Sequence, residues 1–301
     1  MVIRAGILGL SEGNGHPFSF CAIVNGYDEA AFAKAGWPVI LEYLKREPRE
    51  RFGIEGVKVT RAWTQDESVT AKLCAAGRIE KACGKPGDML GEVDAVIVAR
   101  DDWESHAELA LPFLERGLAV FVDKPLTLDA TQLARFEPYL RKGKLMSCAA
   151  LRYARELDPI RDDLAQGRIG APRLIAATVL NGLDKYGIHM LEAAAGLGLG
   201  VPASATRLDA PHEAYALRYA NGLPMSLNCL GAVAKTFHLS VFGDKGHRHA
   251  DLHDNFSAFR RTLERFFAMA RDGKPPIDPD ETIALMQLIA AARKPRTHAA
   301  A

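Results

Sequence analysis

Short apolar runs alternate with amphipathic stretches over the first half of the chain. The runs are rich in β-forming residues and read as buried strands, at Val2–Leu10, Val57–Trp63, Val93–Ala99, Ala119–Val122 and Lys144–Leu151. The stretches between them predict helices, one beginning at Pro17 and others at Pro38–Arg46, Glu67–Ala76, Ala107–Arg116 and Asp129–Arg141. Such alternation predicts an α/β domain over residues 1–150, a doubly wound parallel sheet with right-handed crossovers.

The pattern changes after Leu151. An amphipathic helical stretch at 152–170 is followed by longer β-like runs, at Pro172–Leu180, Ala205–Tyr219, Pro224–Ala232 and Thr236–Phe242. Turn sequences separate the last runs, as in a meander, and two amphipathic helices, Phe256–Arg271 and Pro279–Arg293, follow them. Residues 151–301 are therefore expected to form a second, α+β domain, with KPRTHAAA as a frayed tail.

Composition excludes several classes of function. The 38 Lys and Arg nearly balance the 37 Asp and Glu, so no basic surplus points to nucleic acid or to an anionic membrane. No apolar stretch is long enough to cross a bilayer, and the N-terminus begins a strand at once, without the features of a signal peptide. The five cysteines show no CxxC or Cys/His metal spacing, which favours reduced thiols in a cytoplasmic protein.

The stretch 119–126, AVFVDKPL, carries the first candidate chemistry. Its apolar strand ends in Asp123 and Lys124, and Pro125 prevents the strand from continuing. Ligands of open α/β sheets bind at the carboxyl ends of the strands, so Lys124 is a functional candidate. The alternative is that both charges are ordinary solvated loop residues.

A glycine-rich turn follows the first strand and precedes the helix that begins at Pro17. Its glycines, Gly9, Gly13 and Gly15, are spaced G-x-x-x-G-x-G and not in the usual GxGxxG pattern. Such a turn lets backbone N–H groups and a helix N-terminus approach a phosphate, as in dinucleotide folds. A plain Gly-rich turn remains the alternative.

The end of the second strand meets the adenosine ribose in a dinucleotide fold. Thr64 and Gln65 are neutral there, and Asp66 would repel a 2′-phosphate, which favours NAD while leaving NADP possible. Asp66 is equally well explained as the N-cap of the helix Glu67–Ala76.

Several motifs together resemble the Gfo/Idh/MocA oxidoreductases, the glucose–fructose oxidoreductase and inositol dehydrogenase family. In chain order they are the Gly turn, VDAVIVARDD-x-x-x-H with His106, VFVDKPL, LRY with Arg152, GRIG, DKYGIH, FGDKG and RDGKPPIDPDETIALMQLIAAA. The resemblance implies a Rossmann domain, a C-terminal domain with an open, mostly antiparallel or mixed sheet, and a nicotinamide cofactor. It also implies a sugar, polyol or related substrate, and a homodimer or homotetramer formed through the second domain.

The chain departs from the family pattern at three places besides Asp123, which replaces a glutamate. The glycine spacing is unusual, and Asp101-Asp102 replaces a Thr-Pro pair. The acid expected four residues before the catalytic histidine is Lys185, with Asp184 one position earlier.

The resemblance makes His189 the candidate general acid/base, since its reference pKa lies near working pH. Our hypothesis is that Lys124 donates a hydrogen bond to the reacting oxygen and stabilises its developing charge. Lys185, also predicted to be catalytic, precedes His189 by four residues. If Asp184 caps this helix, both side chains share its first turn, where the helix dipole and their proximity favour a neutral His189.

The predicted cofactor-binding residues are Gly9, Ser11, Gly13, Asn14, Gly15, Thr64, Asp66, Asp101, Asp123 and Lys124. The predicted substrate-binding residues are Arg152, Asp184 and Tyr186, although Arg152 equally well bridges the domains and Tyr186 suits a pocket wall. His106 is expected to fix the start of its helix. The histidines of HRHADLH have the wrong period for one helical face and lie in an expected turn, so we predict no metal site there.

These features favour an NAD(P)-dependent dehydrogenase or reductase acting on a CH–OH group of a sugar-like or polyol substrate. Its chemistry requires Lys124 and His189 to reach the same nicotinamide ring. The alternatives are a catalytically idle relative that binds dinucleotide or ligand as a sensor or scaffold, and a zinc-dependent lyase or hydrolase that uses the His-rich loop.

Overall fold

The computed structural model describes residues 2–293, which form two compact units. The first unit takes in the described residues up to Thr127, together with Ala134–Ser147 and Phe259–Pro279. The second takes in Leu128–Leu133, Cys148–Ala258 and the described residues from Asp280 onward. The domain boundary at residue 150 stays a prediction, and the tail KPRTHAAA lies outside the described residues.

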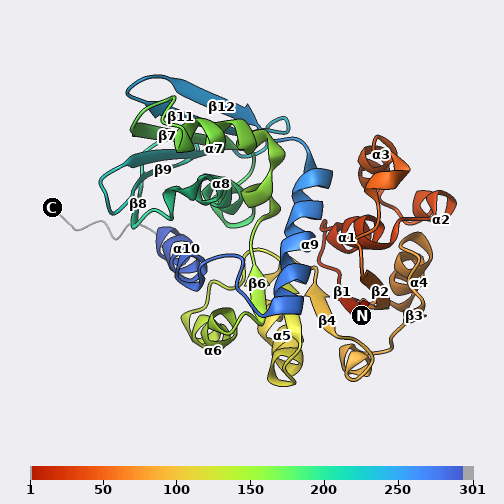
Figure 1. Ribbon diagram of the computed structural model, residues 1–301. Coiled ribbons are helices and arrows are strands. Elements are labelled where there is room, and N and C mark those ends of the chain that lie inside the picture. The colour runs from red at the N-terminus through yellow and green to blue at the C-terminus, as the bar shows by residue number, and fades with distance from the viewer. Residues whose placement is uncertain (1, 294–301) are drawn as a thin grey trace. The chain divides into compact units, whose positions relative to one another are not determined.

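The first unit contains a six-stranded sheet in the order β3-β2-β1-β4-β5-β6, and every neighbouring pair is parallel (Figure 1). Its strands are β1 (Ile3–Leu8), β2 (Val57–Trp63), β3 (Lys81–Ala82), β4 (Ala95–Val98), β5 (Ala119–Val122) and β6 (Leu145–Ser147). All residues of β4 and β5 are buried, as expected for strands that are covered on both faces. The predicted doubly wound parallel sheet is confirmed.

Helices of this unit pack on the sheet and on one another. They are α1 (His16–Asn25), α2 (Glu29–Ala33), α3 (Pro38–Lys45), α4 (Glu67–Ala76) and α5 (His106–Glu115), with most of α6 (Ala130–Arg141) and α9 (Asn255–Asp272). Phe121 of β5 packs between aromatic rings of two of them, with its centroid 6.1 Å from that of Phe20 in α1 and 5.8 Å from that of Phe266 in α9. Aromatic side chains therefore join α1 and α9 to the sheet.

The second unit has a six-stranded mixed sheet in the order β12-β11-β7-β10-β9-β8. Its strands are β7 (Pro172–Val179), β8 (Ser204–Arg207), β9 (Glu213–Arg218), β10 (Pro224–Cys229), β11 (Phe237–Gly243) and β12 (His247–Asp251). The pair β7–β10 is parallel and the other four pairs are antiparallel, which confirms an open, mostly antiparallel sheet. The remaining helices are α7 (Asp158–Ala165), α8 (Ile188–Ala194) and α10 (Pro279–Ala292), and the π-helical turn Leu183–Gly187 leads into α8.

Three predictions about strands were wrong in detail. The run Lys144–Leu151 is a strand only over Leu145–Ser147, because a 3₁₀ helix begins at Ala150. The run Ala205–Tyr219 breaks into β8 and β9 around an exposed connection that contains Pro211. The His-rich segment is strand β12 and not a turn. Ala250 is its one buried residue, so it lacks the apolar pattern of a strand.

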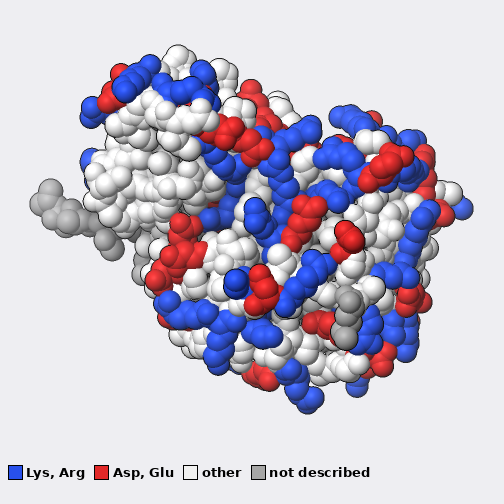
Figure 2. All heavy atoms as spheres, in the orientation of Figure 1, with Lys and Arg blue, Asp and Glu red and all other residues white. Residues whose placement is uncertain are grey.

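Figure 2 shows Lys and Arg interspersed with Asp and Glu over the face that it displays. Within residues 2–293, no helix is both long enough and apolar enough to cross a bilayer.

Replacing Asp66 by alanine is predicted to destabilise the first unit. Asp66 is the N-cap of α4, and its Oδ1 accepts hydrogen bonds from the backbone N–H groups of Ser68 (2.8 Å) and Val69 (3.2 Å). Loss of this cap should lower the free energy of unfolding, seen as a lower urea concentration at the midpoint of denaturation. Asp66→Asn keeps an acceptor and serves as the control. Equal stability of the two variants would contradict the capping role.

Candidate functional site

The candidate site of the first unit lies at the carboxyl end of β5. The buried strand delivers Asp123 and Lys124 there, and the two residues are only 3% and 4% exposed. Burial of a charge is costly unless it is paired, so the partners of these two residues determine what the site can do.

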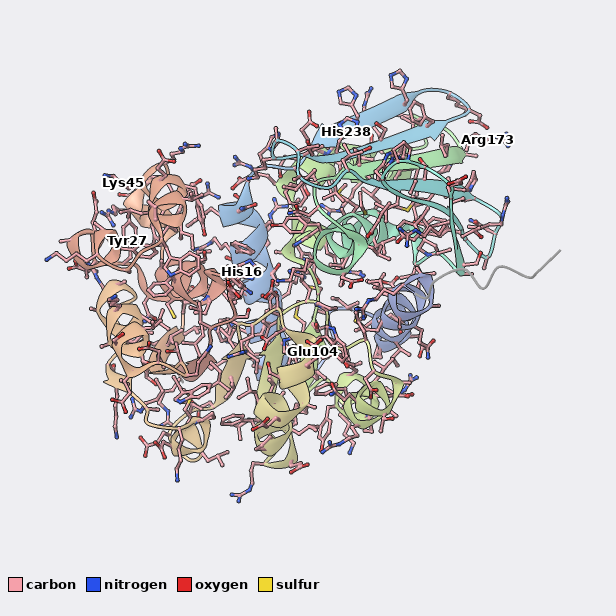
Figure 3. The ribbon with its side chains drawn as sticks, turned by 180° about the vertical axis from the view of Figure 1, so that it is seen from behind. His16, Tyr27, Lys45, Glu104, Arg173 and His238 are labelled. Carbon is pink, nitrogen blue, oxygen red and sulfur yellow. The ribbon has the colours of Figure 1, made fainter. Side chains whose placement is uncertain are left out.

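Asp123 is held by groups from the glycine-rich turn and α1. Its Oδ2 lies 2.5 Å from Nδ1 of His16 and accepts a hydrogen bond from Asn14 Nδ2 at 3.1 Å, while its Oδ1 accepts the backbone N–H of Lys124 at 2.9 Å. Burial by itself raises the pKa of Asp123, but the His16 imidazole and the Lys124 ammonium outweigh it and hold this pKa well below its usual range. The carboxylate is therefore ionised at neutral pH. Figure 3 shows His16 at the start of α1, beside α9.

Lys124 faces a second carboxylate. Its Nζ lies 3.6 Å from Oδ2 of Asp101, in the loop that follows β4. Ser11 of the glycine-rich turn donates to Asp101 Oδ1 at 2.6 Å and accepts the backbone N–H of Asp101 at 3.0 Å. Asp101 thus ties the lysine to the turn. The structure brings together five of the predicted cofactor-binding residues, namely Ser11, Asn14, Asp101, Asp123 and Lys124, which with His16 we call the carboxyl-edge cluster.

The glycine-rich turn is open on its outer side at Gly13. A Cβ at Gly13, whose φ is +74°, would meet no atom within 4 Å. In contrast, a Cβ at Gly15 would lie 2.3 Å from Ile40 Cδ1, and a Cβ at Gly9 would lie 2.5 Å from Pro17 Cγ. Gly9 and Gly15 therefore let the turn pack closely on α1 and α3, and Gly13 leaves its outer side open. This arrangement fits a dinucleotide, and the paired state of Asp101 and Asp123 reduces their repulsion of its phosphates.

The predicted ribose end is built differently from the expectation. The carboxylate of Asp66 caps the N-terminus of α4, and Thr64 Oγ1 donates a hydrogen bond to the backbone carbonyl of Asp66 at 2.7 Å. Next to them lies a network that the sequence reasoning missed. Gln65 Oε1 accepts from Leu10 N at 2.9 Å and from Arg100 Nη1 at 3.0 Å.

Arg100 also forms a two-pronged ion pair with Asp102. Its Nε and Nη2 donate to the two carboxylate oxygens at 2.8 and 2.6 Å. Burial raises the pKa of Asp102, but Arg100 outweighs it and lowers this pKa overall. His106, fully buried, bonds to the carbonyls of Arg100 (3.0 Å) and Leu126 (2.9 Å), which confirms that it fixes this loop and the start of α5.

The candidate site of the second unit is a polar pocket of about 430 Å³. The π-helical turn contributes Asp184, Lys185 and Tyr186 to its wall, and β8 and β9 contribute Arg207 and Glu213. Glu213 accepts the backbone N–H of Leu183 at 2.9 Å and so anchors the start of the turn. Three of the predicted substrate and catalytic residues thus share one pocket.

Asp184 does not cap this helix. The N-cap is Gly182, and the Asp184 carboxylate instead forms an ion pair of 2.8 Å with Arg293. His189 lies one turn further along, in α8, with its ring edge-on to Phe237 at 5.7 Å and 5.9 Å from the ring of Tyr186. The aromatic neighbours fix the plane of the His189 imidazole.

Arg152 is 6% exposed and lies between two carboxylates of its own unit. Its Nε bonds to Glu192 in α8, and its Nη1 donates to Glu281 in α10 at 2.9 Å. Burial lowers the pKa of Arg152, but Glu192 outweighs it and the pKa is raised overall. The predicted role of Arg152 in substrate binding stays a prediction, although two carboxylates already occupy much of its guanidinium.

The His-rich segment carries no such arrangement. His247 and His249 extend from β12, and His249 stacks on His238 of β11 at 5.8 Å. Within the part of the chain that the structure describes, no three His, Cys, Asp or Glu side chains are placed to hold a metal ion.

A comparison with protein families finds a match that lies mostly in the first unit. Residues 31–148 match the family model GFO_IDH_MocA, described as "Oxidoreductase family, NAD-binding Rossmann fold". This stretch of the chain is similar to the Gfo/Idh/MocA family. The resemblance stated from the sequence is confirmed. At the level of the family, so are the predicted class, an NAD-binding oxidoreductase, and the predicted cofactor, NAD.

Solved structures share the fold over nearly the whole chain. A myo-inositol 2-dehydrogenase from Lactobacillus plantarum is 16% identical with a TM-score of 0.75, and 97% of this chain and 96% of that one are covered. A scyllo-inositol dehydrogenase from Lactobacillus casei with NAD(H) and scyllo-inositol is 14% identical, with a TM-score of 0.75 and coverage of 97% and 96%. A putative myo-inositol dehydrogenase from Sinorhizobium meliloti is 18% identical, with a TM-score of 0.72 and coverage of 96% and 95%. No curated protein matches the chain by sequence.

The stability of the protein is predicted to fall in acid partly through Asp123. Because its folded pKa is depressed, its contribution is fully present above about pH 4, the ordinary carboxyl pKa, and is lost as the pH falls below that value. Urea denaturation from pH 7 to pH 3 should therefore show a smaller acid-induced loss for Asp123→Asn than for the parent. If the free energy of unfolding falls equally with pH in the two proteins, Asp123 does not contribute to the loss of stability in acid.

Proposed function

We propose that the protein transfers a hydride between the nicotinamide of NAD and a CH–OH or carbonyl carbon of a polyol or sugar-like substrate. The observation that carries the proposal is a buried lysine at the end of β5, paired with Asp101 and preceded by the ionised Asp123. The family match supports the cofactor. Similar folds named as inositol dehydrogenases, two of them with NAD(H) and an inositol, support the class of substrate.

The carboxyl-edge cluster holds the cofactor in this proposal. Gly13 leaves the turn open to phosphates, while Gly9 and Gly15 let it pack on its helices. Ser11 and Asn14 keep Asp101 and Asp123 in place beside it. NAD supplies or accepts the hydride. Lys124 donates a hydrogen bond to the substrate oxygen and stabilises the negative charge that develops on it. Asp101 lies 3.6 Å from the Lys124 amine and pairs with it inside the protein.

The proton is assigned to His189. Its imidazole takes the proton of the hydroxyl during oxidation and returns it during reduction, as a group with a reference pKa near neutrality can do. Phe237 and Tyr186 orient the ring. In the pocket, Asp184 and Tyr186 bind substrate hydroxyls, Lys185 acts beside His189, and Arg152 positions α8 through Glu192.

Alanine at either of the two central positions is predicted to abolish turnover. Lys124→Ala and His189→Ala should each lower kcat by about 10²-fold or more, because charge stabilisation and proton transfer are lost. NADH affinity, measured by nicotinamide fluorescence, should stay within a few-fold of the parent. Turnover is followed by nicotinamide absorbance with a panel that includes myo-inositol and scyllo-inositol.

Two surface variants serve as controls. Lys142→Ala and His253→Ala change exposed residues of the same two types and should leave kcat unchanged. If Lys124→Ala and His189→Ala both turn over at the parent rate, the assigned roles are wrong. A parent protein that binds NADH but oxidises no polyol would favour the idle sensor or scaffold, and one that binds no dinucleotide would remove the proposed function.

We further propose a cytoplasmic homo-oligomer that forms through the open sheet of the second unit. Cysteines in the described chain are free thiols, in keeping with a reducing compartment. One face of the sheet is buried along the row Leu239, Ala177, Leu227 and Tyr215. The neighbouring row on the opposite face is small and mostly polar, namely His249, Ser240, Ala176, Ser226, Ala216 and Thr206. A flat face of small side chains suits a second copy of itself.

A bulky charge on this face is predicted to break the oligomer. Ala216 is exposed in the middle of β9, so Ala216→Arg places a cation where the two copies would meet. Light scattering after gel filtration should show an oligomer for the parent and a monomer for the variant. Ala165→Arg, at the exposed end of α7, is the matched control. An Ala216→Arg protein of unchanged mass would exclude this interface.

A further inference from the structure

The first unit has a second hollow at the opposite edge of its parallel sheet. Two adjoining cavities of about 600 and 260 Å³ share Asn25, Phe52, Gly53 and Arg78 in their walls. Asn25 is the last residue of α1, whereas His16 of the carboxyl-edge cluster is its first. Figure 3 shows Tyr27, which lines the smaller cavity, well apart from His16. The hollow is therefore separate from the proposed cofactor site.

The walls of this hollow are preformed. Gly53 donates its N–H to Ile23 O at 2.9 Å, and its own carbonyl accepts from Arg260 Nη1 at 2.9 Å. Arg271 Nη2 holds the carbonyl of Glu55 at 2.8 Å. The Asn25 amide joins α1 to the backbone of Val59 on both sides, with two bonds of 2.9 Å. A cavity fixed in this way needs little reorganisation to accept a ligand.

Arg78 occupies a backbone conformation that usually requires glycine. It follows Gly77, the C-cap of α4, and has φ of +52°, in the left-handed region. Helices commonly end with glycine at this position because a side chain there is strained. The Arg78 side chain is exposed and makes no ion pair with any residue in the described range 2–293. Its guanidinium thus gains nothing within the fold to offset the strain.

The surroundings of Arg78 favour an anion with a planar ring. Glu55 is the one acidic side chain in the walls of the two cavities. The other two cations there are paired, Arg49 with Glu29 at 3.1 Å and Lys58 with Glu80 at 2.6 Å, so Arg78 is the cation left for an anion. Arg49 stacks over the ring of Tyr27 at 4.4 Å, and that ring lies 5.2 Å from the ring of Phe52. Guanidinium groups bind phosphate and carboxylate through paired hydrogen bonds, and exposed aromatic edges pack against flat rings.

We propose that this hollow binds a small molecule that carries a phosphate or carboxylate on a planar ring. Arg78 contacts the anion, and Phe52 packs against the ring. The strain at Arg78 is retained in the sequence because its guanidinium serves this ligand and not the fold.

Phenyl phosphate is the probe for the first experiment. Isothermal titration, with NADH present in saturating amount to fill the other edge of the sheet, should show one saturable site. Arg78→Ala should weaken binding by about tenfold or more, as expected for loss of a charge-assisted contact. Arg116→Ala, which removes an exposed arginine elsewhere in the same unit, should leave the affinity unchanged. Equal affinity of the parent and Arg78→Ala, or no saturable binding to the parent, would overturn the proposal.

The Arg78→Gly variant tests separately the role of the guanidinium in ligand binding and the effect of the backbone strain on stability. Arg78→Gly should bind phenyl phosphate as weakly as Arg78→Ala, yet the ligand-free variant should melt at a higher temperature than the parent because the left-handed strain is relieved. If Arg78→Gly binds phenyl phosphate as tightly as the parent, the Arg78 guanidinium does not bind the anion. Inorganic phosphate should bind more weakly than phenyl phosphate. Equal affinities would contradict the proposed contact between Phe52 and a planar ring of the ligand. Neither result depends on oxidoreductase activity, which is measured separately.

Discussion

The burial of two opposite charges at one strand end constrains the whole carboxyl edge of the first unit. Asp123 and Lys124 cannot be desolvated unless each has a partner, because an unpaired ion inside a protein costs several kcal/mol. His16 and Asp101 are those partners, and they come from α1 and from the loop after β4. The positions of the turn, the helix and the loop are therefore linked through the contacts of Asp123 with His16 and of Lys124 with Asp101. An enzyme that must present an ammonium to a reacting oxygen benefits from such an arrangement, because no reorganisation is needed during the reaction.

The second unit also buries a charged side chain that needs partners, and there the partners join two helices. Arg152 is buried between Glu192 and Glu281, which lie on α8 and α10. Because both carboxylates are needed to keep the guanidinium inside, the arginine joins two helices that are far apart in the sequence. Asp184 and Arg293 repeat this link near the surface, again between the α8 region and the end of α10. The polar pocket thus has a framework whose ion pairs are internal, and Lys185, Tyr186 and Arg207 lie on its wall.

Local patterns predict what local forces determine. The strand Val57–Trp63 and the helix Glu67–Ala76 have the bounds expected from the sequence, since apolar runs and an Asp N-cap act within a few residues. Strand β12 was missed because it lies at the edge of the sheet, where four of its five residues are polar and exposed. The pairing of His16 with Asp123 joins residues 107 positions apart, and no periodicity contains that information. A histidine just before Pro17, at the start of a helix beside a predicted anion site, is the one local signal that pointed to it.

The same reasoning explains why NAD suits the end of β2 better than NADP. A 2′-phosphate needs a cation there, and Arg100 is the cation that the fold brings to Gln65. Its guanidinium is already paired with both oxygens of Asp102, and Asp66 beside it is turned to the cap of α4. A phosphate would have to displace one carboxylate and approach another, whereas a 2′-hydroxyl needs only a neutral acceptor. The departures from the family pattern at Asp101 and Asp102 are thus part of the electrostatic design of the edge, because each acid neutralises a cation that the site must hold in place.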